Sequence, residues 1–120
     1  RANEDLILEY GKYKTIKTGL YFEIPSNLEM QIRPRSGLAA KHGVTVLNSP
    51  GTIDSDYRGE IKIILINHST NDFKINVGDR IAQGVFTTPL KKLDFKFKIV
   101  DKLKSDTERS NNGFGSTGIK

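Results

Sequence analysis

The sequence predicts a single all-β domain with a jelly-roll-like barrel or sandwich fold. Apolar and polar residues alternate with period two in several short runs, and clusters of Pro, Gly, Ser, Asn and Asp separate these runs. The spacing of runs and turns is typical of antiparallel sandwiches and barrels. With 120 residues, the chain is long enough for one hydrophobic core and too short for two.

Six runs are predicted to be strands because their side chains alternate in polarity. They are residues 18–25, 28–36, 44–48, 60–69, 73–77 and 80–86. The connections contain turn formers, such as Pro25-Ser26-Asn27 and Ser49-Pro50-Gly51. Only residues 36–43 are expected to form a helical turn or two.

The composition limits the classes of function. The chain has no cysteine, which excludes disulfides and thiolate metal sites. No apolar run approaches the roughly 20 residues that span a bilayer, so we expect a cytoplasmic protein without membrane contact. The formal net charge of +5 favours an anionic partner, although the lysines of residues 91–104 also fit a solvated face.

Three stretches carry residues suited to binding phosphate. Arg35, Ser36 and Gly37 place a guanidinium, a hydroxyl and a glycine before the expected helix. The stretch 78–83 ends in Gln83, whose amide faces either a ligand or water. Residues 105–120 are either a frayed tail or an arm in which glycine N–H groups and hydroxyls bind phosphate and Phe114 stacks on a base.

A fourth stretch, residues 48–63, places two aspartates and a tyrosine between strand-like runs. One interpretation is a turn decorated for solubility, and the other is a pocket that does chemistry on an anion. Asp56 fits the first interpretation, as a local cap or structural contact. His42 and His68 belong to no catalytic pattern and are expected to be structural.

Together these stretches resemble the trimeric dUTP pyrophosphatases (dUTPases). The motifs are PRSG at 34–37, GTIDSDYRGE at 51–60, GDRIAQ at 78–83 and RSNNGFGSTG at 109–118. The resemblance covers nearly the whole chain and implies the β-clip form of the jelly roll. It implies a domain over residues 1–104 and a flexible glycine-rich arm over 105–120 that closes over a nucleotide.

The chain departs from the family pattern at three places. Ser110, Asn111 and Asn112 stand where the arm is usually richer in glycine, and Gly84 stands where a larger apolar residue is common. The family's N-terminal AGxDL box is not matched by Asp5, because the interval to the next motif is too short. Residues 1–3 are instead expected to follow that box, whose aspartate would lie upstream.

The resemblance implies hydrolysis of dUTP to dUMP and pyrophosphate, which removes dUTP and supplies dUMP for thymidylate synthesis. Asp54 would be the general base that activates a water for in-line attack on the α-phosphorus. Tyr57 would lie under the sugar and exclude a 2′-hydroxyl, and Phe114 would stack on the uracil. The residues implied to bind uracil and deoxyribose are Asn48, Gly51, Thr52, Ile53, Asp54, Tyr57, Lys62 and Phe114.

The triphosphate would be bound by a second set of residues. These are Arg35, Ser36, Gly37 and Gln83 on the inner phosphates, and Arg109, Gly115, Ser116 and Thr117 on the outer ones. Mg²⁺ would be held by the phosphates and waters, with no direct protein ligand. Three copies would share three interfacial sites, and no nucleic-acid partner is expected.

The sequence leaves two alternative functions. A dCTP deaminase of the same fold class would need a glutamate poised at the base, and in the stretch TIDSDYRGE at 52–60 none is expected at the pocket positions. A non-catalytic trimer of this fold that binds nucleotides for regulation would show no turnover. Pyrophosphate release from dUTP with Mg²⁺ separates these alternatives.

Overall fold

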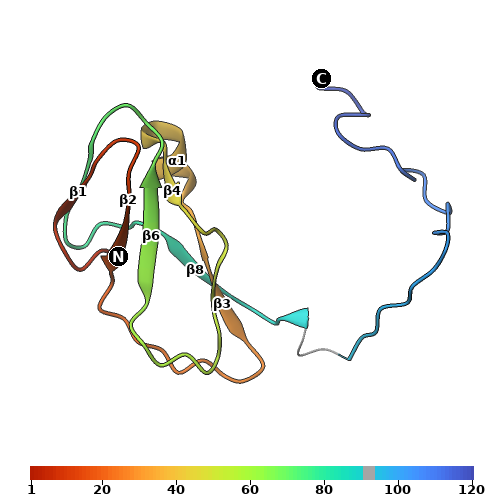
Figure 1. Ribbon diagram of the computed structural model, residues 1–120, viewed down its shortest axis with the longest axis horizontal. Coiled ribbons are helices and arrows are strands. Elements are labelled where there is room, and N and C mark those ends of the chain that lie inside the picture. The colour runs from red at the N-terminus through yellow and green to blue at the C-terminus, as the bar shows by residue number, and fades with distance from the viewer. Residues whose placement is uncertain (91–93) are drawn as a thin grey trace.

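The computed structural model describes residues 1–90 and 94–120 (Figure 1). These residues contain eight strands and one short helix, which confirms the all-β prediction. The elements are β1 (Leu6–Leu8), β2 (Tyr13–Lys17), β3 (Glu29–Arg33), α1 (Ser36–His42), β4 (Val44–Val46), β5 (Gly51–Ile53), β6 (Lys62–Asn67), β7 (Phe73–Ile75) and β8 (Gln83–Thr87).

Two three-stranded sheets form the body of the domain. One has the strand order β2-β6-β4 and the other the order β5-β3-β8, while β1 and β7 form a separate two-stranded sheet. All of these strand pairs are antiparallel. Apolar side chains from the three sheets and their connections form one buried core of Ala2, Leu8, Ile16, Ile24, Met30, Ile32, Val44, Val46, Ile61, Ile63, Leu65, Ile75 and Ile81.

The expected helical turns are present as α1. The helix begins directly after Arg35, whose backbone is extended, and ends at Gly43. Gly43 has φ 63°, a left-handed conformation that favours glycine, and its N–H donates to the carbonyls of Leu38 and Ala39. The helix therefore turns the chain from β3 into β4 at one end of the body (Figure 1).

The predicted strand at residues 18–25 is wrong. Gly19 has φ 69°, which ends the extended conformation just after β2. Beyond Gly19, the described backbone makes one hydrogen bond to a neighbouring segment of the same chain. It runs from the N–H of Ile61 to the carbonyl of Leu20, at 2.8 Å. Three strands were not predicted, namely β1, β2 and β5.

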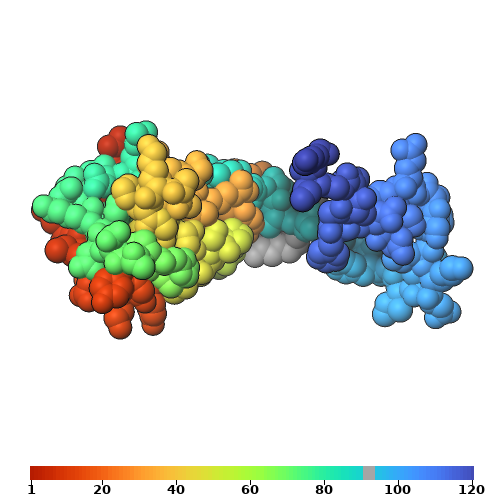
Figure 2. All heavy atoms as spheres, turned by 90° about the horizontal axis from the view of Figure 1, so that it is seen from above, coloured from red at the N-terminus to blue at the C-terminus, as the bar shows by residue number. Residues whose placement is uncertain are grey.

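The other five predicted strands overlap β3, β4, β6, β7 and β8, with shorter bounds. Residues 94–120 contain no helix or strand and project from the body (Figure 2). Residues 91–93, part of the lysine-rich stretch, lie outside the described residues, and the boundary after residue 104 stays a prediction. Among the described residues, no helix is long and apolar enough to cross a membrane.

Candidate functional site

The loop of residues 54–61, which we call the Asp54 loop, joins β5 to β6. It does not close a paired hairpin, because β5 pairs with β3 whereas β6 pairs with β2 and β4. The loop therefore crosses from one three-stranded sheet to the other. Its first turn is fixed by a 3.1 Å hydrogen bond from the N–H of Tyr57 to the carbonyl of Asp54.

Tyr57 is held in place by its own loop. Its hydroxyl donates to the carbonyl of Glu60 at 2.9 Å, and the side chain is 43% exposed. A Cβ atom on Gly59 would lie 2.4 Å from that hydroxyl oxygen, so any other residue there would displace the ring. Arg58 Nη1 donates to the carbonyl of Ser55 at 2.7 Å and stiffens the turn. The partly exposed ring of Tyr57 is therefore held by hydrogen bonds within the Asp54 loop itself.

A pocket of about 450 Å³ opens over this loop. Its lining residues are Thr52, Ile53, Asp54, Asp56, Tyr57, Glu60 and Lys62. Five of the residues predicted to bind uracil and deoxyribose therefore surround one cavity. Asn48 and Gly51 lie beside it, around a smaller cavity that shares Thr52, Ile53 and Lys62 with the first.

Close packing brings the side chain of Asn48 onto the start of β5. Its Nδ2 atom is 3.4 Å from the position that a Cβ atom on Gly51 would occupy. A Cβ atom on Gly51 would therefore make an ordinary van der Waals contact with Asn48. The seven predicted body residues of this set thus form one contiguous region.

Gly59 and Glu60 belong to the site although neither was predicted to. Both support Tyr57: Gly59 leaves room for the ring, and the backbone carbonyl of Glu60 accepts a hydrogen bond from the hydroxyl. The signal was present, because both residues are part of the quoted motif at 51–60. It was missed because neither offers a side chain with obvious chemistry.

The predicted inner-phosphate residues form a second group, at the junction of β3, α1 and β8. Arg35 Nη1 donates to the carbonyl of Arg80 at 3.0 Å, and Gln83 Nε2 donates to the carbonyl of Pro34 at 2.9 Å. These bonds tie the motif at 34–37 to the motif at 78–83. Ser36 and Gly37 are exposed at the start of α1 beside them.

The two groups lie at opposite ends of β3 in one copy of the chain. Ile53, just before the Asp54 loop, is opposite Met30 near the start of β3, whereas Arg35 follows the end of that strand. Five strand residues span roughly 15 Å. Figure 1 shows α1 at one end of the body and the Asp54 loop, which runs into the start of β6, at the other. A single copy therefore does not bring its own Asp54 beside its own Arg35.

The predicted arm meets neither group. Arg109 Nε donates to the carbonyl of Asn112 at 2.8 Å, and Phe114 and Gly115 both have positive φ, so the arm forms its own turns. The side chain of Phe114 is fully exposed. Arg109, Gly115, Ser116 and Thr117 line a shallow pocket of about 510 Å³ within the arm itself. The arm residues are thus grouped but stand away from the body (Figure 1).

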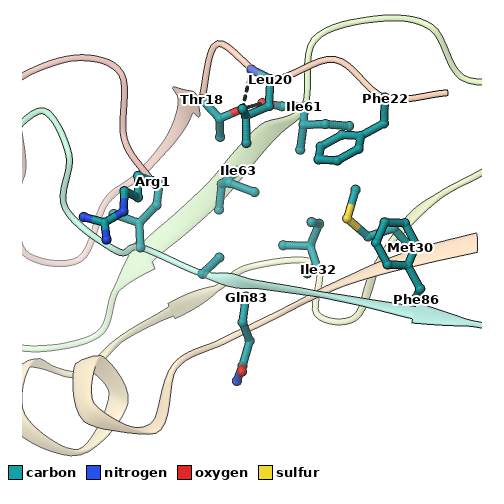
Figure 3. A pocket seen from close by; sticks show the side chains of 13 residues that line it. Arg1, Thr18, Leu20, Phe22, Met30, Ile32, Ile61, Ile63, Gln83 and Phe86 are labelled. Atoms are coloured by element: carbon teal, nitrogen blue, oxygen red, sulfur yellow. Dashed lines mark hydrogen bonds between the residues drawn. The ribbon is translucent and has the colours of Figure 1, made fainter. Parts of the chain in front are cut away.

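The most apolar cavity of the described residues shares Gln83 with the inner-phosphate group and no residue with the pocket of the Asp54 loop. It has a volume of about 240 Å³ and lies between β6 on one side and β3 and β8 on the other (Figure 3). Met30 fills part of the space opposite Gly84, since its sulfur lies 2.7 Å from where a Cβ atom on Gly84 would be. A larger residue at position 84 would therefore displace Met30.

Comparison with known proteins identifies the family. The dUTPase family profile matches residues 1–118. The chain belongs to the dUTPase family. It is 58% identical over 115 residues to the deoxyuridine 5'-triphosphate nucleotidohydrolase of Nautilia profundicola. The matched region covers 96% of this chain and 78% of that protein. The protein of the same name from Clostridioides difficile is 54% identical over 116 residues, covering 97% and 78%.

Solved dUTPase structures share the fold. The Staphylococcus bacteriophage 80alpha dUTPase with dUPNHPP is 26% identical, with a TM-score of 0.75 over 98% of this chain and 83% of that one. The EIAV dUTPase superposes with a TM-score of 0.73 over 85% and 82%. The predicted jelly-roll-like fold of the dUTPases is thereby confirmed.

The residues of this chain would fit a Mg²⁺ ion that is bound through the phosphates of a substrate and through waters. Among residues 1–90 and 94–120, no three His, Asp, Glu or Cys side chains are grouped as metal ligands. Mg²⁺ commonly keeps several waters and binds through substrate phosphates in place of an all-protein cage. Asp54 and Asp56 line the pocket in which such waters would lie.

Proposed function

We propose that the protein hydrolyses dUTP to dUMP and pyrophosphate. The observation that carries this proposal is the pocket of the Asp54 loop, where a carboxylate and a tyrosine ring face one cavity in a member of the dUTPase family. The relatives named above carry the name of this activity. Removal of dUTP and supply of dUMP for thymidylate synthesis would be its role.

The uracil and deoxyribose would occupy the pocket of the Asp54 loop. Backbone groups of β5 would pair with the uracil edge, while Asn48, in the turn after β4, and Lys62, at the start of β6, would contact the base and sugar. Tyr57, held by Glu60, would pack under the sugar and exclude a 2′-hydroxyl. A pocket of this kind discriminates by steric fit and by hydrogen bonds left unmade with the wrong base.

Asp54 would act as the general base. It follows β5 directly, in an exposed position at the pocket. In this role its carboxylate takes a proton from a water that attacks the α-phosphorus in line, with pyrophosphate as the leaving group. Bound Mg²⁺ would neutralise phosphate charge and orient the triphosphate.

The phosphates would be bound by groups that neutralise their charge. Arg35, Ser36, Gly37 and Gln83 would bind the inner phosphates, and the first and last of these are already positioned by bonds to the neighbouring backbone. Arg109, Gly115, Ser116 and Thr117 would close over the outer phosphates, with Phe114 stacked on the uracil. Closure of such a segment excludes water from the reacting centre.

We propose that the active assembly is a homotrimer. In one copy, the Asp54 loop and the inner-phosphate residues lie at opposite ends of β3, and the arm stands away from both. A complete site would combine the Asp54 loop of one copy, Arg35 and Gln83 of a second and the arm of a third. The exposed Phe97 and Ile99, ahead of the arm, would then be covered by another copy.

The direct test is pyrophosphate release with Mg²⁺ from dUTP, dTTP, dCTP and UTP, each assayed separately. We expect turnover of dUTP and at least ~100-fold lower kcat/KM for the other three, since mismatches in a tight pocket reach that scale. Comparable rates with dCTP or UTP would contradict the assignment of the pocket. Binding of dUTP without pyrophosphate release would instead indicate the regulatory alternative.

A further inference from the structure

The outer face of the β5-β3-β8 sheet carries a polar row that includes Arg33. Met30 and Ile32 are buried on the inner face, so the alternate residues of β3 point outward. Arg33 is the register partner of Gln83 on β8. Figure 3 shows the side chain of Gln83 directed away from the cavity that Met30 and Ile32 line. Arg33 and Gln83 therefore share the outer face.

The register places these two side chains side by side. Directly opposite residues of an antiparallel pair have Cβ atoms about 5 Å apart. Gln83 belongs to the inner-phosphate group, and its amide already bonds the carbonyl of Pro34, the residue after Arg33. The guanidinium of Arg33 is therefore within side-chain reach of any phosphate bound by that group.

A chain of hydrogen bonds begins at the guanidinium of Arg33. Its Nη2 donates to Gln31 Oε1 at 3.1 Å, and Gln31 Nε2 donates to Glu29 Oε1 at 3.3 Å. Thr87 Oγ1 donates to the same Glu29 oxygen at 3.3 Å. This row is polar along its whole length, which orients the guanidinium without burying it.

Most of the binding capacity of Arg33 is unused. A guanidinium has about five N–H donors, and the described residues accept from one of them. The side chain is exposed. A fixed planar cation with free donors is the group that binds phosphate oxygens best.

We propose that Arg33 is a further specificity-determining residue, which binds the outer phosphates of the nucleotide and favours triphosphate over monophosphate. The proposal rests on the proposed function, because it needs the substrate to be bound by Gln83 and its neighbours. Most of the negative charge of a nucleoside triphosphate lies on its two outer phosphates. Arg33 is the register partner of Gln83 and has the longer side chain of the two, so a rotation of this exposed side chain would carry its guanidinium past the amide.

The test compares the affinities of a non-hydrolysable dUTP analogue and of dUMP, each with Mg²⁺, by calorimetry. We expect Arg33→Gln to weaken the analogue by ~10-fold and dUMP by less than ~2-fold, because a charge-assisted hydrogen bond to an exposed group is worth that much. Arg33→Lys should fall between, since it keeps the charge and loses the fork. Lys74→Gln, which removes an exposed cation from the β1-β7 sheet, is the control and should change neither affinity.

Two results would overturn the proposal while leaving the proposed function intact. One is wild-type affinity for the analogue in Arg33→Gln, and the other is equal weakening of the analogue and dUMP. An unchanged melting temperature in Arg33→Gln excludes loss of folding as the cause of weaker binding. Failure of the wild-type protein to release pyrophosphate from dUTP would refute the proposed function itself, and this proposal with it.

Discussion

Residues 1–90 and residues 94–120 both alternate apolar with polar side chains, but only the first region buries them. In β6, Ile63 and Leu65 are buried and alternate with more exposed neighbours. In the stretch 95–99, Phe97 and Ile99 are 92% and 98% exposed although they alternate with lysines. This stretch alternates in polarity more strictly than β6, whose sequence KIILIN has four consecutive apolar residues, and yet β6 is the one that buries side chains.

The difference shows that a strand pattern needs a partner edge. β6 has β2 on one side and β4 on the other, which satisfies its backbone and covers its apolar face. For the exposed stretch, the described contacts include a ring pair between Phe95 and Phe97 at 5.3 Å. We therefore expect the body to supply stability and the chemistry of the base and sugar, and the terminal segment to supply closure of a site between copies.

The largest effect is expected from Asp54→Asn, which changes chemistry in the body without changing its shape. We expect kcat to fall by ~10²- to 10⁴-fold, because the general base is lost, while analogue binding and the melting temperature are retained. Asp56→Asn, in the same loop, is the matched control and should keep most of the activity. A larger loss in the control would show that the roles of the two aspartates are reversed.

Next in size is the effect of Leu65→Ala, which tests whether stability resides in the body. Leu65 is fully buried in the central strand of its sheet, so the cavity should lower the free energy of unfolding by about 2–5 kcal/mol. Ile119→Ala, in the fully exposed arm, should change it by less than about 0.5 kcal/mol. Denaturant unfolding measures both, and equal losses would mean that the arm packs on the body.

Deletion of the chain after Glu108 should have the third-largest effect, confined to activity. The arm buries almost nothing in the described structure, so the melting temperature and the assembly should be retained. We expect kcat/KM for dUTP to fall at least ~100-fold, or about 2.7 kcal/mol, because the outer-phosphate groups and the lid are lost. Full activity of the shortened protein would show that the segment is only a tail.

The sequence predicted the fold class well because the buried strands alternate clearly. It missed β2, in which Ile16 is the single buried residue, and β5, which has only three residues. It placed a strand at 18–25 because polarity alternates there, whereas the positive φ of Gly19 turns the chain out of the sheet. Alternation reports the polarity of a surface, and it does not report backbone conformation.

Much of the candidate site was predicted by motif, and its arrangement was not. The motif residues fall into the expected base and phosphate groups, with Gly59 and Glu60 added as supports of Tyr57. That the Asp54 loop joins two different sheets depends on long-range pairing, which local sequence does not encode. The separation of the groups along β3 likewise follows from register alone.

Complementation between two inactive variants tests the central claim most directly, namely that the arm closes a site on another copy. Asp54→Asn keeps its arm, and the protein shortened after Glu108 keeps its Asp54. If they are denatured, mixed in equal amounts and refolded together, half of the sites have Asp54 and half of those have an arm, so about a quarter of wild-type activity is expected. If each arm served its own copy, no site would contain both, and the mixture would stay as inactive as its parts.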